Sequence, residues 1–584
     1  MAEVRSMAQV HWTGHPFVDA GLAALAAAAK VQRLEDLMPE HLEIATKELE
    51  RILLSDQALG IGVGKAFSGP KKALQRVFPN SELDNPSNWR GETAEGKAEN
   101  VRRKFREALA SELRKAQQCL QVAGGDEVCF ACGERRQAEA MEIRRKDKMP
   151  LLEGIVNFYP AFAYGVRICG LCALAVRFLP MAVMRTGVQN RLWFLHTQAL
   201  PVATVIAQTY GWEHFDRHIA ANEILDFFSS WETAGDAGTV LYLLCELLER
   251  FGDQVRAIYQ SPLPTTAYVF SNDNRGGFVQ ALPVPNDLLR FLAKLQLESK
   301  HAFQRFWREL MQVPNGLSEK ERRIRIGFVQ SVAQRLLNGD ALVGSCLEPD
   351  IPKLHGGWIG HRLYLKEVRG MVVEKLAIIE RLGIAIAQSD DAKKRLNELQ
   401  RAQRNELYGV LLRYVRQGWL KHDEFYSLLP PNDYGAAGEV RDIVLAVAYE
   451  WKRCQEQGEE FPALGGQATF SPDETLSRLQ QIGERLIASL PNLSRWIAQL
   501  QTARQAERIR DVYLSAVRAG AMGFADFVFL APLDDRHRLW LLRDYLLAFL
   551  FDRAPGAVPE EEEIAAGIGE VQQGQANVSI LTTE

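Results

Sequence analysis

Two short cysteine-containing stretches, CFACG at 129–133 and ICGLC at 168–172, constrain the fold of this chain most strongly. They contain four of its eight cysteines. A CxxC turn brings two thiolates within reach of one ion, so two such turns can supply the four corners of a tetrahedral site. Zinc is the natural ion for four thiolates, and an iron–sulfur cluster is the alternative. The candidate ligands are Cys129, Cys132, Cys169 and Cys172.

The spacing of the two pairs favours a structural metal. The 36 residues between them exceed the spacing of a compact zinc ribbon, so another element must be inserted there. Gly133 and Gly170 suit turns in which backbone N–H groups approach sulfur. A site closed by four sulfurs has no open position at which water could be activated. The metal is therefore expected to hold the fold together.

Other readings of the cysteines fit less well. A redox pair would sit at a strand-to-helix junction in a βαβ unit, which neither stretch has. A zinc deaminase would need Pro where Val128 and Ile168 stand. The alternative without a function is that the two CxxC sequences occur by chance and their thiols are buried and inert. The remaining cysteines are solitary in the sequence, and they are Cys119, Cys245, Cys346 and Cys454.

Composition indicates a large globular protein. The chain has 584 residues, of which 47% are hydrophobic and 24% charged. No apolar run is long enough to span a bilayer, and the first residues lack the pattern of a signal peptide. We therefore expect a cytoplasmic protein without a membrane contact. A reducing compartment favours metal over disulfides for paired cysteines.

The periodicity predicts an α+β, helix-rich fold. A mixed domain is expected over 1–350, with the zinc-binding insert at about 119–175. Its residues 173–230 are expected to be mostly helical core, and the run broken by NDNRGG at 272–277 predicts a hairpin. A helical region follows over 355–554, and its end at about 440–554 predicts a small bundle. Residues 555–584 hold six Glu and no Lys or Arg, and are expected to be disordered.

One helix of that bundle is predicted in detail. SPDETLSRLQQIGERLIASL at 471–490 opens with Ser471 as N-cap and Pro472 at the first helical position. Glu474 completes a capping box. Leucine and isoleucine then recur at three- and four-residue spacing, which predicts one buried stripe.

Basic stretches on a nearly neutral chain predict local contacts with phosphate groups. GIGVGKAFSGPKK at 60–72 lacks the spacing of a nucleotide-binding loop, because three residues separate Gly60 from Gly64 and Ala66 follows the lysine. It could instead lie against a nucleic-acid backbone. Solvated helix faces are the alternative for every basic stretch. The candidates are Lys65, Lys71, Lys72, Arg76, Arg102, Arg103, Arg322, Arg323, Lys393 and Lys394.

No motif predicts a catalytic residue. WEHFDRH places His214 and His218 one helical turn apart, without the H-E-x-x-H order or a third ligand nearby. The chain has no G-x-S-x-G turn and no acidic cluster with the spacing of a two-metal nuclease. We therefore expect no enzymatic activity.

Three features in order resemble one known family. They are WTGHPFVDAG at 12–21, CFACG at 129–133, and NFYPAF followed by CGLC at 157–172. Together they resemble the CXXC–CXXC subfamily of large subunits of type I CRISPR surveillance (Cascade) complexes, of the I-A/I-B group. The resemblance covers roughly the first 200 residues. Beyond them, only the length and the helix-rich C-terminus are similar.

The resemblance implies a non-catalytic subunit of an RNA-guided complex. Its partners would be a guide crRNA, target double-stranded DNA, the backbone and small subunits, and a helicase–nuclease. The guide reads sequence by pairing, while the protein reads a short flanking motif, the PAM, and stabilises the opened DNA as an R-loop. The end of the helical region would resemble the small subunit. Asn88 or Trp89 is expected near a base edge or wedged into the duplex.

Two other functions stay open. The first is a zinc-containing enzyme that processes nucleic acid. The second is a structural protein-interaction module whose basic stretches are solvated faces.

Overall fold

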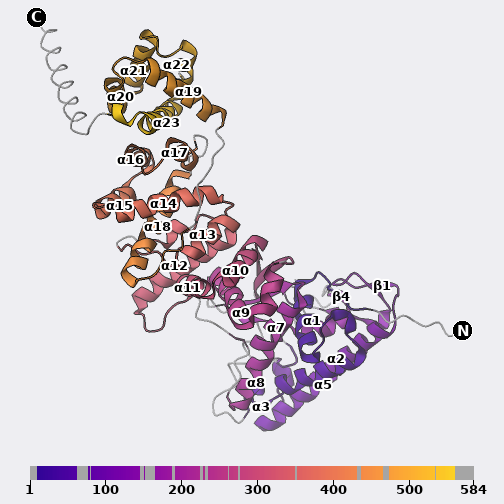
Figure 1. The fold of residues 1–584 in the computed structure, drawn as a ribbon. Helices are drawn as coiled ribbons and strands as arrows, with labels where there is room; N and C mark the ends of the chain where they lie inside the picture. The colour runs from indigo at the N-terminus through magenta and orange to yellow at the C-terminus, as the bar shows by residue number, and fades with distance from the viewer. Residues whose placement is uncertain are drawn as a thin grey trace, which may run out of the picture. The chain divides into compact units, whose positions relative to one another are not determined.

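The computed structural model divides into two compact units, Met1–Asp340 and Ala341–Glu584, each described here by itself (Figure 1). Helices dominate both units, and the small sheets lie in the first, so the predicted helix-rich α+β class is confirmed. The residues that the structure describes are 9–61, 77–78, 81–83, 85–144, 150, 165–186, 191–223, 228–229, 235–260, 262–273, 276–348, 351–430, 436–463, 473–532 and 535–558.

Helix α1 (Pro16–Ala29) is the buried centre of the first unit. Every residue from Phe17 to Ala26 is buried. Small side chains let its neighbours approach closely. A Cβ added to Gly21 would lie 1.9 Å from the carbonyl oxygen of Ala175 in the adjacent helix. The elements packed around α1 include α2 (Pro39–Leu53), α6 (Gly170–Arg177), α7 (Leu200–Ile206) and β6 (Leu192–Thr197).

A four-stranded antiparallel sheet lies beside this helix, in the order β5-β6-β7-β8. The outer pair, β7 (Thr265–Asp273) and β8 (Gly276–Val284), is the hairpin that the sequence predicted. The other two strands, β5 (Met184–Arg185) and β6, fall where mostly helix was expected. All but one of the β6 residues are buried. Its continuous apolar run therefore had no alternation to distinguish a strand from a buried helix.

Helix α5 (Ala94–Gln121) is the long scaffold of the region around the cysteines. Thr93 caps it, because its Oγ1 accepts a hydrogen bond of 3.0 Å from the Gly96 N–H. Its buried face packs on α2 and α6. The other helices of the first unit are η1 (Leu34–Asp36), α3 (Asp56–Leu59), η2 (Pro86–Asn88), η3 (Ala138–Ala140), η5 (Leu179–Met181), the π-helix η6 (Ala207–Trp212), α8 (Glu213–Ala220), α9 (Gly235–Gln260), α10 (Asn286–Glu298), α11 (Lys300–Met311) and α12 (Glu319–Asn338).

The second unit is helical throughout its described residues, apart from one isolated bridge between Leu347 and Leu354. Helix α23 (Arg536–Arg553) is largely buried and contacts the helices on either side of it. The helices that pack on α23 are α16 (Arg404–Arg416), α17 (His422–Leu428), α19 (Glu474–Ser489), α20 (Leu493–Thr502), α21 (Ala506–Arg518), α22 (Phe524–Leu530) and η8 (Pro555–Ala557). The other helices of this unit are η7 (Val343–Cys346), α13 (Trp358–Glu367), α14 (Val373–Gln388), α15 (Ala392–Arg401) and α18 (Ala436–Gln457).

The predicted start of α19 was wrong by a few residues. Asp473 is the N-cap, and its carboxylate accepts a hydrogen bond of 2.8 Å from the Leu476 N–H. Ser471 and Pro472 lie outside the described residues. Both Ser and Asp are strong N-caps, so the sequence offered two starts. The predicted stripe is present, with Leu476, Leu479, Ile482 and Leu486 buried.

In the described part of the chain, every helix is too short or too polar to cross a bilayer.

Asp19 organises the N-terminal motif WTGHPFVDAG. Its side chain is fully buried, and its oxygens accept hydrogen bonds from the Thr13 N–H at 2.8 Å, the Thr13 hydroxyl at 2.7 Å and the Gly14 N–H at 3.0 Å. The Nε2 atom of His196 in β6 lies 2.9 Å from Oδ2, the oxygen that also accepts from Gly14. The motif is therefore a turn closed around one carboxylate and anchored to the sheet.

Replacing Asp19 with Ala should destabilise the first unit. The substitution removes the buried carboxylate that accepts from half-buried Thr13 and exposed Gly14, which costs about 2 kcal/mol in the free energy of unfolding. Urea titration of the full chain measures this loss. The exposed Asp36 is the control, since its replacement by Ala should change stability little. Equal effects of the two substitutions would contradict the anchoring role of Asp19.

Candidate metal centre

The four predicted ligands lie together in space. Their Sγ atoms all fall within 4.8 Å of one another, and those of Cys132 and Cys169 are 3.9 Å apart. Cys132 is half-buried, and the other three cysteines are buried. A tetrahedral ion with bonds of about 2.3 Å to sulfur needs sulfurs about 3.8 Å apart. This donor set could therefore hold one metal ion such as zinc.

A small hairpin builds the first cysteine pair. Strands β1 (Glu127–Val128) and β2 (Arg135–Arg136) pair antiparallel. Between them, the Cys129 N–H donates to the Glu134 carbonyl and the Gly133 N–H donates to the Cys129 carbonyl, each at 2.9 Å. Gly133 has φ of +72°, a conformation that favours glycine. The predicted turn at Gly133 is thus confirmed.

A strand-to-helix junction builds the second pair, which corrects the expectation that neither stretch lies at one; the strand is antiparallel to its neighbour, so no βαβ unit surrounds it. Strand β4 (Val166–Cys169) pairs with β3 (Met141–Arg144), which places Cys169 opposite Met141. Cys169 is also the N-cap residue of α6, and Cys172 lies in the first turn of that helix. The positive end of the helix dipole therefore lies at the sulfurs and favours thiolates.

Gly170 has a different role from the one expected. A Cβ at this position would lie 2.5 Å from the backbone carbon and the Cβ of Lys115. The glycine therefore permits close packing of α6 on α5. No left-handed turn is involved, because Gly170 is not among the residues with positive φ.

Two hydrogen bonds join the halves of the site. The Phe130 N–H donates to the Arg167 carbonyl at 2.9 Å, and the Cys169 N–H lies 3.2 Å from the Cys129 sulfur. Hydrogen bonds from Cys132, Cys169 and Cys172 lower the pKa of the Cys129 thiol. The same contact with Cys129 raises the pKa of Cys172. Negative charge therefore settles first on Cys129, where several donors converge.

Residues 124–184 match the family model described as CRISPR-associated protein (Cas_CXXC_CXXC). The chain therefore carries a domain similar to that of CRISPR-associated proteins with two CxxC pairs, here called the CXXC–CXXC domain and defined as residues 124–184. No curated protein and no solved structure matches the chain. The match contains all four clustered cysteines.

Sequence reasoning missed a fifth cysteine at this site. Cys119 was expected to be solitary, but its buried sulfur lies against the CXXC–CXXC domain, 3.8 Å from the Ala140 carbonyl oxygen. A hydrogen bond with Cys169 lowers the pKa of the Cys119 thiol to about 7. Cys119 lies near the C-terminal end of α5, ten residues before Cys129. Only the packing of α5 on α6 reveals this proximity.

The N-terminal motif also contacts the CXXC–CXXC domain. The rings of His15 and Phe130 are 6.3 Å apart. Burial lowers the pKa of His15, so its imidazole tends to be neutral. The motif WTGHPFVDAG at 12–21 and the cysteine stretch CFACG at 129–133, which are far apart in the sequence, are therefore neighbours in the fold.

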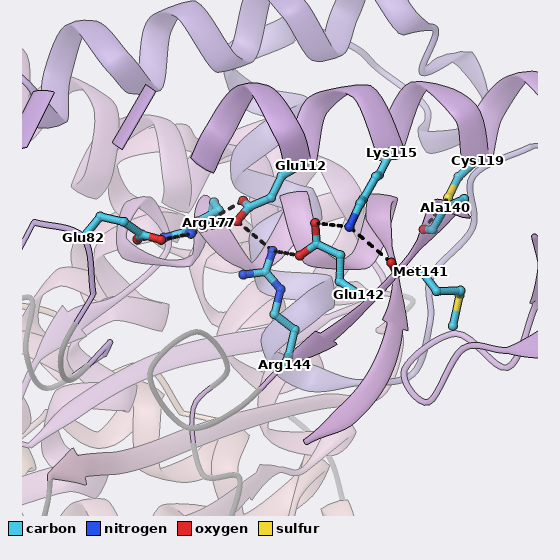
Figure 2. Close-up of polar contacts among 9 residues, drawn as sticks. All are labelled: Glu82, Glu112, Lys115, Cys119, Ala140, Met141, Glu142, Arg144 and Arg177. Atoms are coloured by element: carbon cyan, nitrogen blue, oxygen red, sulfur yellow. Dashed lines mark hydrogen bonds and ion pairs between the residues drawn. The ribbon is translucent and has the colours of Figure 1, made fainter. Parts of the chain in front are cut away.

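A buried network of charges lies along the same α5–α6 interface (Figure 2). Arg177 at the end of α6 binds Glu112 of α5 at 2.7 Å and Glu82 at 2.8 Å. Arg144 of β3 binds the same Glu112 at 2.8 Å. The network extends from Arg144 through Glu142, 2.8 Å away, to Lys115.

The network balances three carboxylates against three cations. Arg144, Glu112 and Arg177 each have side chains no more than 5% exposed. Charges this deeply buried are tolerated only when they are paired. The pairing therefore fixes β3, which lies between the two cysteine pairs, against α5 and α6. Sequence reasoning missed the network because its members are spread from residue 82 to residue 177.

The nucleic-acid contacts predicted for residues 65–89 fall partly inside and partly outside the described residues. Lys65, Lys71, Lys72 and Arg76 lie outside the described residues. The Asn88 side-chain amide and the Trp89 indole N–H donate to the carbonyls of Glu82 and Leu83, both at 2.9 Å. These bonds hold the loop before α5. A role for either side chain at DNA stays a prediction.

Several predicted arginines are engaged within the protein. Arg102 donates to the Leu54 carbonyl at 3.1 Å and pairs with Asp56. Arg103 pairs with Glu107 at 2.8 Å, and Arg323 pairs with Glu319 at 2.5 Å. Arg322 is exposed at the start of α12 and also has a partner. Their contacts with nucleic acid stay predictions.

Lys393 and Lys394 line a groove of about 1160 Å³ in the second unit. Its walls are α15, α16 and α23, with Val410, Leu547 and Phe551 among the lining residues. Arg401 joins the two lysines on the exposed face of α15. Within the described residues, none of these three cations has an ion-pair partner. We call Lys393, Lys394 and Arg401 the α15 cations.

His214 and His218 do not form a metal site with other groups in the described part of the chain. Their rings are 4.7 Å apart, and His218 lies 3.3 Å from Glu223. Among these described residues, only the four cysteines gather three or more candidate ligands closely enough to share an ion.

Replacing Glu112 with Gln should expose the charge network as a pH-dependent contribution to stability. Burial alone would raise the pKa of Glu112, but the charges of Arg177 and Arg144 outweigh it and lower that pKa. The carboxylate therefore stabilises the fold above its unfolded-state pKa, about 4.3. This stabilisation is lost as the pH falls through the lower, folded-state pKa.

Urea unfolding of the wild-type chain and of Glu112→Gln between pH 7 and pH 3 measures this effect. The difference in unfolding free energy should be about 3 kcal/mol at pH 7 and should shrink in the acidic range. The exposed Glu95 is the control, and its Gln variant should follow the wild type throughout. A difference that stays constant with pH would refute the assignment.

Proposed function

We propose that the chain is the large subunit of a type I, RNA-guided DNA surveillance complex. The observation that carries the proposal is the family match over residues 124–184, which contains the whole four-cysteine cluster. The contact between His15 and Phe130 supports it, because the N-terminal motif and the CXXC–CXXC domain together form the resemblance. In this proposal the guide RNA reads target sequence, and the chain reads the flanking motif and helps to recruit the helicase–nuclease.

The metal in this proposal is a structural zinc ion. Sulfur atoms within 4.8 Å of one another leave room for a single ion, whereas a cluster would place several iron and sulfide atoms among them. Four thiolates also fill all four positions of a tetrahedral ion, so no water would be bound and activated. We therefore propose a binding and positioning role for the chain and no catalysis.

Nucleic acid is proposed to contact the groove beside α15. Its three unpaired cations lie within a span of nine residues on an exposed helical face. Phosphate oxygens are the natural partners of such a row, since every neutralised phosphate releases counterions. The engaged side chains of Arg102 and Arg103 have competing partners and are weaker candidates.

Purification of the tagged full chain from cells that also make its neighbouring subunits tests the complex. We expect a guide RNA of uniform length to copurify with the chain and the backbone subunits. RNA extraction and mass spectrometry of the assembly provide the measurement. Recovery of the chain alone, free of RNA and other subunits, would contradict the proposal. Metal-dependent cleavage of nucleic acid by the isolated chain would favour a zinc-containing enzyme instead.

Metal analysis of the purified chain tests the zinc assignment. We expect about one zinc per chain, with the zinc lost and the melting temperature lowered in Cys169→Ser. Cys245→Ala is the matched control, because Cys245 is buried in α9 away from the four-cysteine cluster. Iron together with acid-labile sulfide would establish a cluster in place of zinc.

A further inference from the structure

The groove beside α15 has an unequal balance of paired and unpaired charges. Of its lining arginines, Arg413 pairs with Glu398 and Arg543 pairs with Asp544. Asp391, also in the lining, pairs with Arg395. These pairs cancel internally, whereas the three α15 cations have no ion-pair partner in the described residues. Asp390 and Glu406 also line the groove, so the whole lining holds six Lys or Arg against five Asp or Glu, and the excess positive charge lies at the α15 cations.

The C-terminal end of the described chain lies beside this groove. Residues Arg543, Asp544, Leu547 and Phe551 of α23 line it, and Phe551 is seven residues from Val558, where the described chain ends. After α23, η8 packs against both α23 and α20. Helix α20 contributes Gln501 to the groove lining. The chain therefore leaves the described structure next to a wall of the groove.

The sequence that follows has the opposite charge. Four consecutive carboxylates, Glu560 to Glu563, come directly after Pro559, and no Lys or Arg occurs from residue 559 to the end. Apolar Ile564, Ile568 and Val571 follow them. An extended chain advances about 3.5 Å per residue, so the acidic run reaches up to roughly 17 Å from Val558. It thus begins within reach of the adjoining groove.

We propose that the acidic segment 559–571 binds in the groove beside α15 and competes there with nucleic acid. The carboxylates of Glu560 to Glu563 take the place of phosphates on the α15 cations. A tethered segment has an effective concentration on the order of 1 mM, so even a weak intrinsic affinity fills the groove. The attraction between the segment and the cations decreases as salt is added.

The docking itself is independent of the proposed function, and only the competition rests on it. The docked segment prevents nucleic acid of low affinity from binding in the groove. A strand that makes many additional contacts with the protein displaces the segment. Neutralising the acidic run should therefore free the groove. The variant that does this without shortening the chain is Glu560→Gln combined with Glu561→Gln, Glu562→Gln and Glu563→Gln, here called the tail variant.

Zero-length coupling of carboxylates to amines in the full chain tests the docking. A carbodiimide should join Glu560 to Glu563 with Lys393 or Lys394, and peptide mapping should locate the bonds. Lys421 is the control, since it is exposed in the same unit and does not line the groove. Coupling should disappear in the tail variant and decrease in high salt. Equal coupling to Lys421, or coupling only between chains in a mixed isotope sample, would overturn the docking.

Binding of a labelled single-stranded DNA tests the competition. The tail variant should bind about tenfold more tightly than the wild-type chain. The substitution of Gln572 and Gln573 by Ala, in the same tail, should leave the affinity unchanged. In a Lys393→Gln and Lys394→Gln background, the tail substitutions should have no further effect. An affinity gain that persists in that background would overturn the competition.

The two readouts separate the inference from the proposed function. Coupling to the groove lysines without any DNA binding would contradict a nucleic-acid role and leave the docking intact. Salt-sensitive DNA binding without coupling would support the nucleic-acid role and overturn the docking.

Discussion

Two cysteine pairs that lie 36 residues apart in sequence close on a single point, and the structure of the CXXC–CXXC domain depends on that closure. Neither half is large. The first half is a hairpin whose two strands have two residues each. The second half is a strand that runs into an eight-residue helix. Such short elements do not bury enough apolar surface to hold one another in place. A metal ion held by the four sulfurs would supply the missing constraint, and the hydrogen bond from the Cys169 N–H to the Cys129 sulfur joins the two halves without it.

The buried charge network provides a second constraint on the same elements. Removing one partner from a buried ionic network leaves an unpaired charge in the interior, which is far more costly than a poor surface contact. Arg144, Glu112 and Arg177 therefore accept only one arrangement of β3, α5 and α6. The four clustered sulfurs, which could hold a metal ion, lie at one end of this interface, and the ion pairs fix the other. Gly170 lets the helices approach closely enough for both to form.

The sequence predicted these features unevenly, for physical reasons. The ligand cysteines were identifiable because CxxC spacing is local and because metal chemistry demands it. The β7–β8 hairpin was identifiable from its turn residues. Strand β6 was missed because a strand buried on both faces has no alternation. Cys119 and the charge network were missed because their contacts join residues that only the tertiary packing brings together.

Basic composition was the weakest guide to function, and ion pairing explains why. Arg103 and Arg323 lie in stretches as basic as the one at 393–405, yet their guanidinium groups are paired with Glu107 and Glu319 one helical turn away. A paired cation must give up its partner before it can take a phosphate, so it contributes less to binding than its charge suggests. The α15 cations line a groove that also contains carboxylates, yet in the described residues none of the three cations forms an ion pair. A chain whose net charge is −4 can therefore present a positive site, and an acidic segment elsewhere in the same chain can be its natural competitor.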